Sequence, residues 1–178
     1  KLTILATPNN PTGLAIPRMD VERIIRASKG FVVIDEAYHE FNPEGSAVDM
    51  LSHYPNVIVM RTFSKAFGLA GLRVGYLIAR APVIGEMMKA RLPFMVDRLA
   101  EQVALLLLRH KDLVRERIES IQENTSALFE AMSEIEGLEV LPSHTNFLLF
   151  RTGQDPATLL NALADRGVLV RNMGGYEE

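Results

Sequence analysis

The chain has 178 residues, so it is long enough to bury a hydrophobic core in one domain or two small ones. Its 48% hydrophobic and 23% charged residues are typical of globular proteins, and the net charge of −3 gives no reason to expect a nucleic acid partner. The absence of cysteine excludes a disulfide scaffold, a thiolate nucleophile and a cysteine zinc site. The four histidines show no metal-ligand spacing, so no metal site is predicted.

Nothing in the sequence predicts a membrane protein. The longest purely apolar run, residues 103–108, is far shorter than the ~20 residues of a membrane-spanning helix. Residues 1–6 lead straight into a turn and do not resemble a signal peptide. We therefore expect a soluble, cytoplasmic protein.

Four short apolar runs in the first half predict buried strands, at residues 2–6, 31–34, 57–60 and 74–79. A helix is expected between the first two runs, from about Pro17 to Ser28, with Gly30 closing it. The runs are continuous rather than alternating, which indicates strands buried on both faces. This pattern predicts an α/β fold with a mainly parallel sheet and helices on both faces.

The second half is strongly helical from about Asp97. Apolar residues at spacings of three and four between Val114 and Met132 predict one long amphipathic helix. Beyond it we expect strands at 138–141, 146–150 and 168–170, with a helix at 155–165. The pattern divides the chain into a large α/β part, residues 1–95, and a second part, residues 96–178, with linking helices and a smaller α+β unit.

Polar side chains follow the first three predicted strands at the point where each one ends. Ligands of open α/β sheets bind outside the carboxyl ends of the strands, so these residues are expected to converge on one site. They are Asn10 after the first strand, Asp35 and Tyr38 after the second, and Thr62, Ser64 and Lys65 after the third.

Lys65 is the central candidate for chemistry. A lysine held at a strand end, near hydroxyls and an arginine, can form a Schiff base with pyridoxal phosphate. Arg73 offers a planar, permanently charged fork for the phosphate, and Thr62 and Ser64 offer neutral donors. Taken singly, Lys65 is more simply a solvated lysine and Arg73 a partner in a surface salt bridge.

Asp35 ends an apolar strand, where a charged carboxylate is costly unless it is paired. It could cap the next helix, or it could pair with a protonated pyridine nitrogen and keep that ring electron-withdrawing. Tyr38 and Asn10 could both donate to the cofactor's ring oxygen. Packing for Tyr38 and an ordinary turn for Asn10 are the alternatives.

Three segments together resemble a known family. They are PNNPTG at residues 8–13, VIDEAY at 33–38 and TFSKAFGLAGLRVGY at 62–76. Their order and spacing resemble those of the class I/II pyridoxal-phosphate aminotransferases of fold type I. Within that family, residues 61–67, 92–94, 146–150 and 167–171 are most similar to histidinol-phosphate aminotransferases, the enzymes of histidine biosynthesis.

The resemblance implies a role for each candidate residue. Lys65 matches the Schiff-base lysine and general base, and Asp35 matches the partner of the pyridine nitrogen. Tyr38 and Asn10 match the ring-oxygen donors, with Asn10 also near the substrate, and Thr62, Ser64 and Arg73 match phosphate-binding positions. Arg171 lies near where this subfamily handles the acidic end of its substrate, although an exposed arginine after an edge strand is the simpler interpretation.

The resemblance also implies partners and a larger enzyme. An amino substrate, expected to be histidinol phosphate, would exchange its amino group with the pair 2-oxoglutarate and glutamate, in a homodimer whose sites are completed by the neighbouring subunit. Family members begin with a phosphate loop and a ring-stacking aromatic, and they continue to a further substrate arginine. The chain therefore resembles the middle and later part of the family's fold type I enzymes.

Three alternatives remain open. A threonine-phosphate decarboxylase resembles this subfamily closely and differs in which substrate bond is broken. A non-catalytic binding module of the same fold is a second alternative, against which the intact Lys65 and Asp35 argue. Residues 31–36 also resemble the magnesium-binding strand of a P-loop NTPase, but that interpretation requires a G-x-x-x-x-G-K-[ST] loop, which this sequence does not contain.

Overall fold

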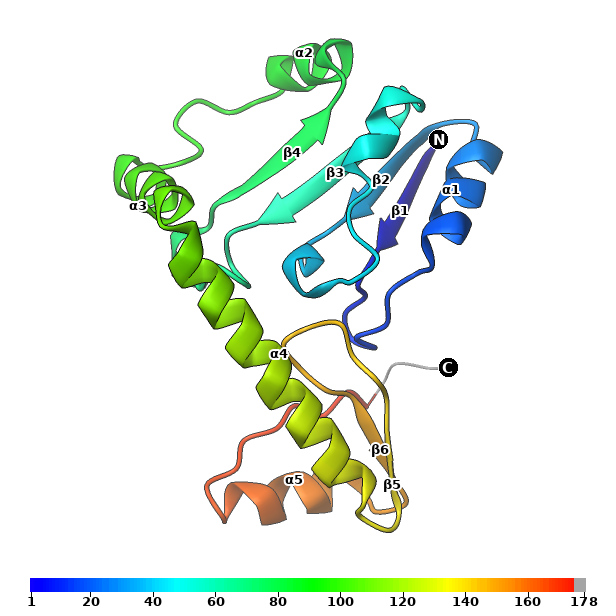
Figure 1. The fold of residues 1–178 in the computed structure, drawn as a ribbon, viewed down its shortest axis with the longest axis vertical. Coiled ribbons are helices and arrows are strands. Elements are labelled where there is room, and N and C mark those ends of the chain that lie inside the picture. Colours follow the sequence, from blue (N-terminus) through cyan, green and yellow to red (C-terminus); the bar gives the residue numbers. More distant parts are fainter. Residues whose placement is uncertain (175–178) are drawn as a thin grey trace.

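A four-stranded sheet occupies the first half of the chain in the computed structural model, which describes residues 1–174 (Figure 1). The strands run in the order β1-β2-β3-β4 and comprise Leu2–Ala6, Phe31–Asp35, Val57–Thr62 and Gly75–Ala79. β1, β2 and β3 are parallel, whereas β4 is antiparallel to β3. The four predicted apolar runs thus form a mainly parallel sheet, as expected.

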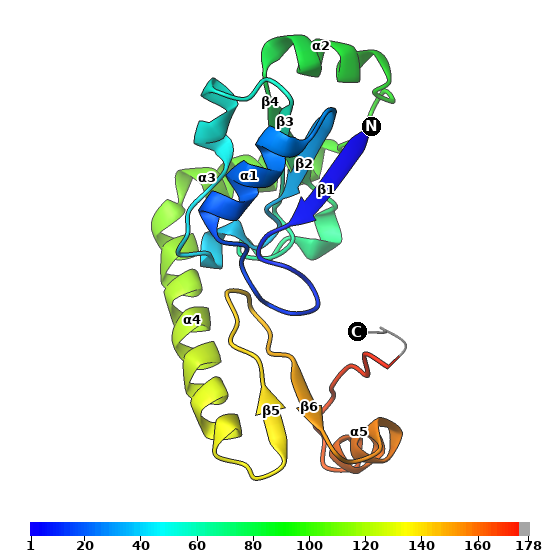
Figure 2. The same cartoon turned by 90° about the vertical axis from the view of Figure 1, so that its right-hand side faces the viewer.

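The main hydrophobic core lies between this sheet and α1, Arg18–Ala27 (Figure 2). The short 3-10 helix η2, Val48–Ser52, closes the same core with Met50. On the opposite face of β1, Leu2 and Ile4 are exposed. The buried members of the core are Val21, Ile25, Val32, Ile34, Ala47, Met50, Val57 and Val59.

Gly30 does not end α1 as predicted. The helix ends at Ala27 and its C-cap is Ser28, whose backbone is extended. Gly30 instead lies against the start of β1, where a Cβ atom would overlap the carbonyl oxygen of Lys1. The glycine is needed for a close approach between two backbones rather than for a left-handed helix cap.

The second half is built around α4, which extends from the sheet to a small two-stranded ribbon (Figures 1 and 2). The long helix predicted from its apolar stripe is confirmed, although Leu128 on that stripe is exposed. Among residues 1–174, no helix has the length and apolar character needed to cross a membrane. The elements are α2 Ala81–Lys89, α3 Arg98–Arg109, α4 Lys111–Ser133, β5 Leu138–Val140, β6 Phe150–Thr152 and α5 Pro156–Ala164.

Two of the predicted strands differ from the structure. β6 begins at Phe150, so the strand expected at 146–150 is mostly an irregular loop that precedes it. Residues 168–170 form no strand within the described part of the chain, and Leu169 is 87% exposed there. An apolar run becomes a strand only where a neighbouring strand accepts its backbone hydrogen bonds, and residues 168–170 have no such neighbour among residues 1–174.

The two halves meet below the carboxyl ends of the strands. Ile118 and Ile121 of α4 pack against Tyr38 and Phe41, which follow β2. From the loop between β5 and β6, the His144 amide donates to the Gly13 carbonyl at 2.8 Å. Gly13 has φ 76° and no room for a side chain, because Ser143 lies against it. The second half therefore contacts the turn that carries Asn10.

Candidate active site

The parallel strands bring their polar ends to one edge of the sheet. Asp35 is the last residue of β2, and Thr62 is the last residue of β3. The Thr7 amide, just beyond β1, donates to the Asp35 carbonyl at 3.0 Å, which ties the turn of residues 8–13 to the end of β2. The predicted site residues of these strands therefore lie along one edge, where open α/β sheets bind their ligands.

Asn10, Tyr38 and Lys65 come together at this edge. The Asn10 Nδ2 atom donates to the Tyr38 hydroxyl at 3.0 Å. The Lys65 Nζ atom lies 5.2 Å from the centroid of the Tyr38 ring, within the range of a cation–π contact. Tyr38 is only 5% exposed, and the ring of Phe147 packs edge-on against it at 5.4 Å. The buried Tyr38 side chain thus contacts both the Asn10 amide and the Lys65 amine.

Asp35 is half-buried at the end of β2. Its Oδ1 atom accepts a hydrogen bond from the Ala37 amide at 3.0 Å, in the manner of an Asx turn. Within residues 1–174, the second oxygen, Oδ2, makes no hydrogen bond. The carboxylate therefore has one oxygen that orients it and one oxygen free for a ligand.

Thr62 and Ser64 form a small hydroxyl cluster at the end of β3. Their side-chain oxygens are 2.9 Å apart, and the Ser64 amide donates to Thr62 Oγ1 at 3.0 Å. The Phe63 amide donates to the Val74 carbonyl at 3.0 Å, so the backbone next to Arg73 adjoins this cluster. Backbone and hydroxyl donors gathered at one turn suit an anionic oxygen.

The two arginines are not joined to this cluster. Arg73 has a left-handed backbone, with φ 53°, and its exposed guanidinium donates to the Ala70 carbonyl at 2.8 Å. Arg171 is exposed in the segment that follows α5, beyond the small ribbon. The structure thus brings the strand-end residues together but leaves Arg73 on its own loop and Arg171 in the second half.

The sequence of residues 1–177 matches the aminotransferase class I and II family. The chain belongs to that family. This confirms the resemblance seen in the three segments, and the family assignment replaces the P-loop interpretation of residues 31–36.

Curated relatives of this aminotransferase chain include the histidinol-phosphate aminotransferases of Chlorobaculum tepidum and Thermoanaerobacter sp. They are 40% and 42% identical, over 97% and 99% of the chain but only 49% and 50% of the relatives. The chain therefore spans about half the length of the curated relatives it matches.

Solved structures give the same fold. Histidinol-phosphate aminotransferase from Sinorhizobium meliloti, in complex with pyridoxal-5'-phosphate, superposes with a TM-score of 0.87 at 32% identity, over 98% of this chain and 50% of that one. L-threonine-O-3-phosphate decarboxylase from Porphyromonas gingivalis also superposes with a TM-score of 0.87, at 28% identity, over 99% of this chain and 56% of that one. The fold type I assignment is therefore confirmed.

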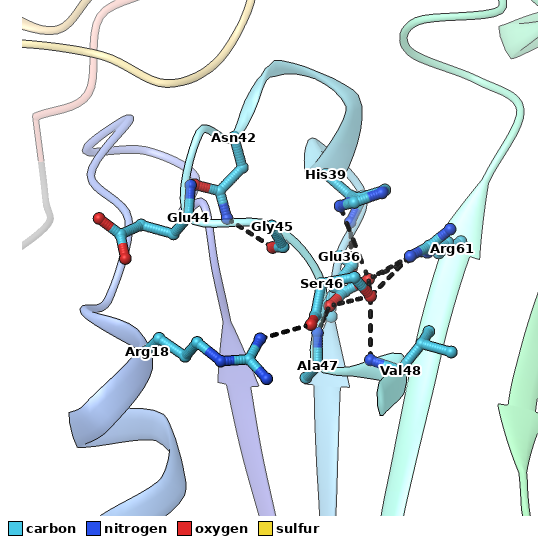
Figure 3. A network of polar contacts seen from close by, with 12 residues as sticks. Arg18, Glu36, His39, Asn42, Glu44, Gly45, Ser46, Ala47, Val48 and Arg61 are labelled. Atoms are coloured by element: carbon cyan, nitrogen blue, oxygen red, sulfur yellow. Dashed lines mark hydrogen bonds and ion pairs between the residues drawn. The ribbon is translucent and has the colours of Figure 1, made fainter. Parts of the chain in front are cut away.

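The aminotransferase chain also has a buried polar network beside the site, which we did not predict from the sequence (Figure 3). Glu36 is 3% exposed and accepts hydrogen bonds from Arg61 Nε at 2.9 Å and from the Ala47 amide at 2.6 Å. The Ser46 hydroxyl donates to the same carboxylate at 2.8 Å. The sequence feature that could have indicated this network is an acidic residue, Glu36, and a basic residue, Arg61, at the ends of two neighbouring apolar strands.

Electrostatics in this network fix the charge states. Burial would lower the pKa of Arg61, but hydrogen bonds to Tyr76 and Glu36 outweigh it, so the pKa is raised. The Nδ1 atom of His39 lies 4.0 Å from Glu36 Oε2. Burial and the positive charge of Arg61 lower the pKa of His39, although Glu36 opposes them. Arg61 therefore keeps its positive charge, and His39 is neutral at neutral pH.

Proposed function

We propose that the protein carrying this chain is a pyridoxal-phosphate-dependent aminotransferase that acts on histidinol phosphate, with 2-oxoglutarate and glutamate as the second substrate pair. The observation that carries this proposal is the meeting of Lys65 with the Asn10–Tyr38 hydrogen-bonded pair, at the same sheet edge as Asp35. The relatives at about 40% identity named histidinol-phosphate aminotransferase support the choice of substrate.

The side chains at the sheet edge fit the chemistry of pyridoxal phosphate. The cofactor has an aldehyde, a ring oxygen, a basic pyridine nitrogen and a phosphate, and each group needs a different partner. The Lys65 amine suits the aldehyde, and the Asp35 carboxylate, with its free Oδ2, suits a protonated nitrogen. The Asn10–Tyr38 pair suits the ring oxygen. The hydroxyls of Thr62 and Ser64, together with Arg73, suit the phosphate.

When bound, the cofactor supplies an electron-withdrawing ring that stabilises negative charge on the substrate carbon bearing the amino group. Asp35 would hold a proton on the pyridine nitrogen, because an ion pair there favours the charged form. The Tyr38 hydroxyl and the Asn10 amide would orient the ring through its oxygen. The Lys65 amine would remove a proton from the substrate carbon as general base.

Substrate recognition is assigned to Asn10 and Arg171. Asn10 lies on the turn after β1, where its amide faces the same space as Lys65 and Tyr38. Arg171 carries a permanent charge and is exposed, so it can pair with the acidic end of a substrate. We propose that it binds the phosphate of histidinol phosphate.

A decarboxylase of threonine phosphate is the second candidate, favoured by the Porphyromonas gingivalis structure with its TM-score of 0.87. Both candidate substrates carry an amino group and a phosphate, so both fit the proposed donors. Only the decarboxylase substrate has a carboxylate on the carbon that bears the amino group. The identity of 28% to that structure, against 32% to the Sinorhizobium meliloti aminotransferase, supports the transaminase.

Organisation and assembly follow from the same proposal. Residues 1–95 would belong to the large cofactor-binding domain, and residues 96–178 would form linking helices and part of the small domain. We propose a cytoplasmic homodimer. Large apolar side chains exposed between α2 and α3, among them Phe94 at 97% and Leu92 at 69%, support an additional protein contact there.

The test is a substrate assay on the full-length protein with added pyridoxal phosphate. Histidinol phosphate with 2-oxoglutarate should yield glutamate, and threonine phosphate should yield no carbon dioxide. Release of carbon dioxide without glutamate would favour the decarboxylase. Cofactor binding without turnover of either substrate would indicate a non-catalytic module.

A further inference from the structure

A buried ion pair joins the strands that carry the two halves of the proposed cofactor site. Glu36 directly follows Asp35 of β2, and Arg61 directly precedes Thr62 of β3. Two nitrogens of Arg61, Nε and Nη2, each lie 2.9 Å from the same oxygen of Glu36. The side chains of Glu36 and Arg61 are 3% and 16% exposed, so the pair is well shielded from water.

Strand geometry relates this pair to the site on the opposite face. Asp35 lies opposite Met60 in the β2–β3 register, and the Glu36 amide donates to the Met60 carbonyl at 2.8 Å. Successive side chains of a strand point to opposite faces. Asp35 and Thr62 therefore share the ligand-binding face, while Glu36 and Arg61 meet on the face of the hydrophobic core.

The pair is itself held on several sides (Figure 3). Ser46 donates to Glu36 at 2.8 Å and accepts from Arg61 Nη2 at 2.7 Å, and its carbonyl accepts from Arg18 Nη1 of α1 at 2.9 Å. Tyr76 lies opposite Arg61 in the β3–β4 register. Both oxygens of Glu36 and two nitrogens of Arg61 are engaged in hydrogen bonds, which restricts the geometry of the pair and so the distance between the two strand ends.

We propose that Glu36 and Arg61 are positioning residues, which set Asp35 at the correct separation from the Thr62–Lys65 segment. This inference rests on the proposed function. Asp35 must meet the pyridine nitrogen while Lys65 reaches the aldehyde of the same rigid ring. A displacement of one strand end relative to the other therefore misplaces one of these contacts, and a misplacement of about 1 Å can cost on the order of 10²-fold in rate.

The test separates positioning from stability with a paired substitution. Glu36→Gln alone leaves the Arg61 charge buried without its partner, which destabilises a protein whatever the pair does for the site. The double variant E36Q/R61M removes both charges, and the amide oxygen introduced by E36Q can still accept from the Ala47 amide. Glu22→Gln, which breaks the exposed Glu22–Arg26 pair on α1, is the matched control.

Three quantities are measured on the full-length protein: the thermal unfolding midpoint, the absorbance of bound pyridoxal phosphate as a function of pH, and turnover. We expect E36Q/R61M to recover most of the stability that Glu36→Gln loses. Its turnover should still fall by on the order of 10²-fold, with a shifted midpoint of the absorbance titration. The Glu22→Gln control should match the wild type in all three.

Recovery of turnover and of the absorbance profile together with stability would overturn the inference, because the pair would then be structural only. If E36Q/R61M does not fold, Arg61→Lys is used in its place, because lysine keeps the charge without the planar fork. A wild-type absorbance profile in Arg61→Lys would likewise overturn the inference.

A wild-type protein that binds no pyridoxal phosphate would contradict the proposed function instead. Amide hydrogen exchange at residues 35–37 and 62–66 of the cofactor-free protein then decides the inference: faster exchange in the variant at both strand ends supports it, and unchanged exchange overturns it.

Discussion

The central strands of the first half and the second half of the chain differ in how completely they bury their apolar residues. In the central strands, Val32, Ile34, Val57 and Val59 are all 0% exposed. In the second half, large apolar side chains remain exposed along α3, α4 and the segment after α5, up to 87% for Leu169. Exposed apolar side chains also occur in the first half outside these strands, as at Phe94. The central strands are therefore a packed scaffold, and the second half has surfaces still available for other contacts.

The candidate site follows the same division. The carboxylate, the phenol, the amine and the hydroxyls all come from strand ends and turns of the first half. The second half contributes packing: Phe147 lies against Tyr38, and Ile118 and Ile121 pack beside it. Sites supported by strands hold their geometry more precisely than sites on loops. Variants in each half test whether chemistry and packing are divided in this way.

The largest effect is expected from Lys65→Ala. Of the site residues brought together at the sheet edge, Lys65 alone carries an amine that can both bond the cofactor aldehyde and move the proton. Turnover and covalent cofactor attachment should therefore be abolished. Steady-state assays and absorbance spectra of the purified protein check this. Lys29→Ala, at an exposed lysine after α1, is the control and should retain full activity.

Asp35→Asn should cut the rate by orders of magnitude while largely sparing cofactor binding. An amide cannot stabilise a protonated pyridine nitrogen by ion pairing, but the phosphate and ring-oxygen contacts are unchanged. Turnover and the dissociation constant for pyridoxal phosphate are the two quantities to compare. A near-normal rate would mean that Asp35 acts only through its Asx turn with Ala37.

A pair of stability variants sharpens the contrast between the halves. Ile34→Ala, at a fully buried position of β2, should lower the free energy of unfolding by roughly 2–5 kcal/mol. Leu169→Ala, at an exposed position of the second half, should change it by about 0.5 kcal/mol or less. Urea unfolding monitored by circular dichroism measures both. Equal losses would show that the second half is as tightly packed as the first.

The smallest effect is a pH dependence through His39. Because burial and Arg61 lower the pKa of His39 in the folded state, the unfolded chain binds a proton first as the pH falls through about 6.5. The folded state therefore loses stability from that pH down to the lowered pKa. His39→Gln should flatten the pH dependence of unfolding in this window, and an unchanged slope would contradict the assigned cause.

The strands of the first half could be predicted because short, continuous apolar runs bounded by turn residues are typical of buried strands. The convergence of the candidate residues could be predicted because they follow strands whose parallel order places their ends together. The Asn10–Tyr38 hydrogen bond and the Lys65–Tyr38 contact give this expectation a definite geometry. Turn geometry decides which hydroxyl, amide and carboxylate groups already form hydrogen bonds within the protein. These hydrogen bonds could be identified only from the structure.

The errors have a common physical origin in tertiary contacts. Residues 168–170 are apolar but have no neighbouring strand among the described residues, and β6 starts only where it pairs with β5. Gly30 is required by the nearby Lys1 backbone, which lies far away in sequence. The Glu36–Arg61 pair was missed for the same reason, because its partners are 25 residues apart. Local patterns do not report such contacts.

The most direct test of the central claim is borohydride reduction of the full-length protein after addition of pyridoxal phosphate, followed by peptide mass spectrometry. Reduction makes any bond between the cofactor and a lysine amine permanent, so the modified residue can be identified. The account predicts a single pyridoxal-phosphate adduct on Lys65, absent in Lys65→Ala. A folded protein with no adduct on Lys65 would contradict the proposed aminotransferase chemistry.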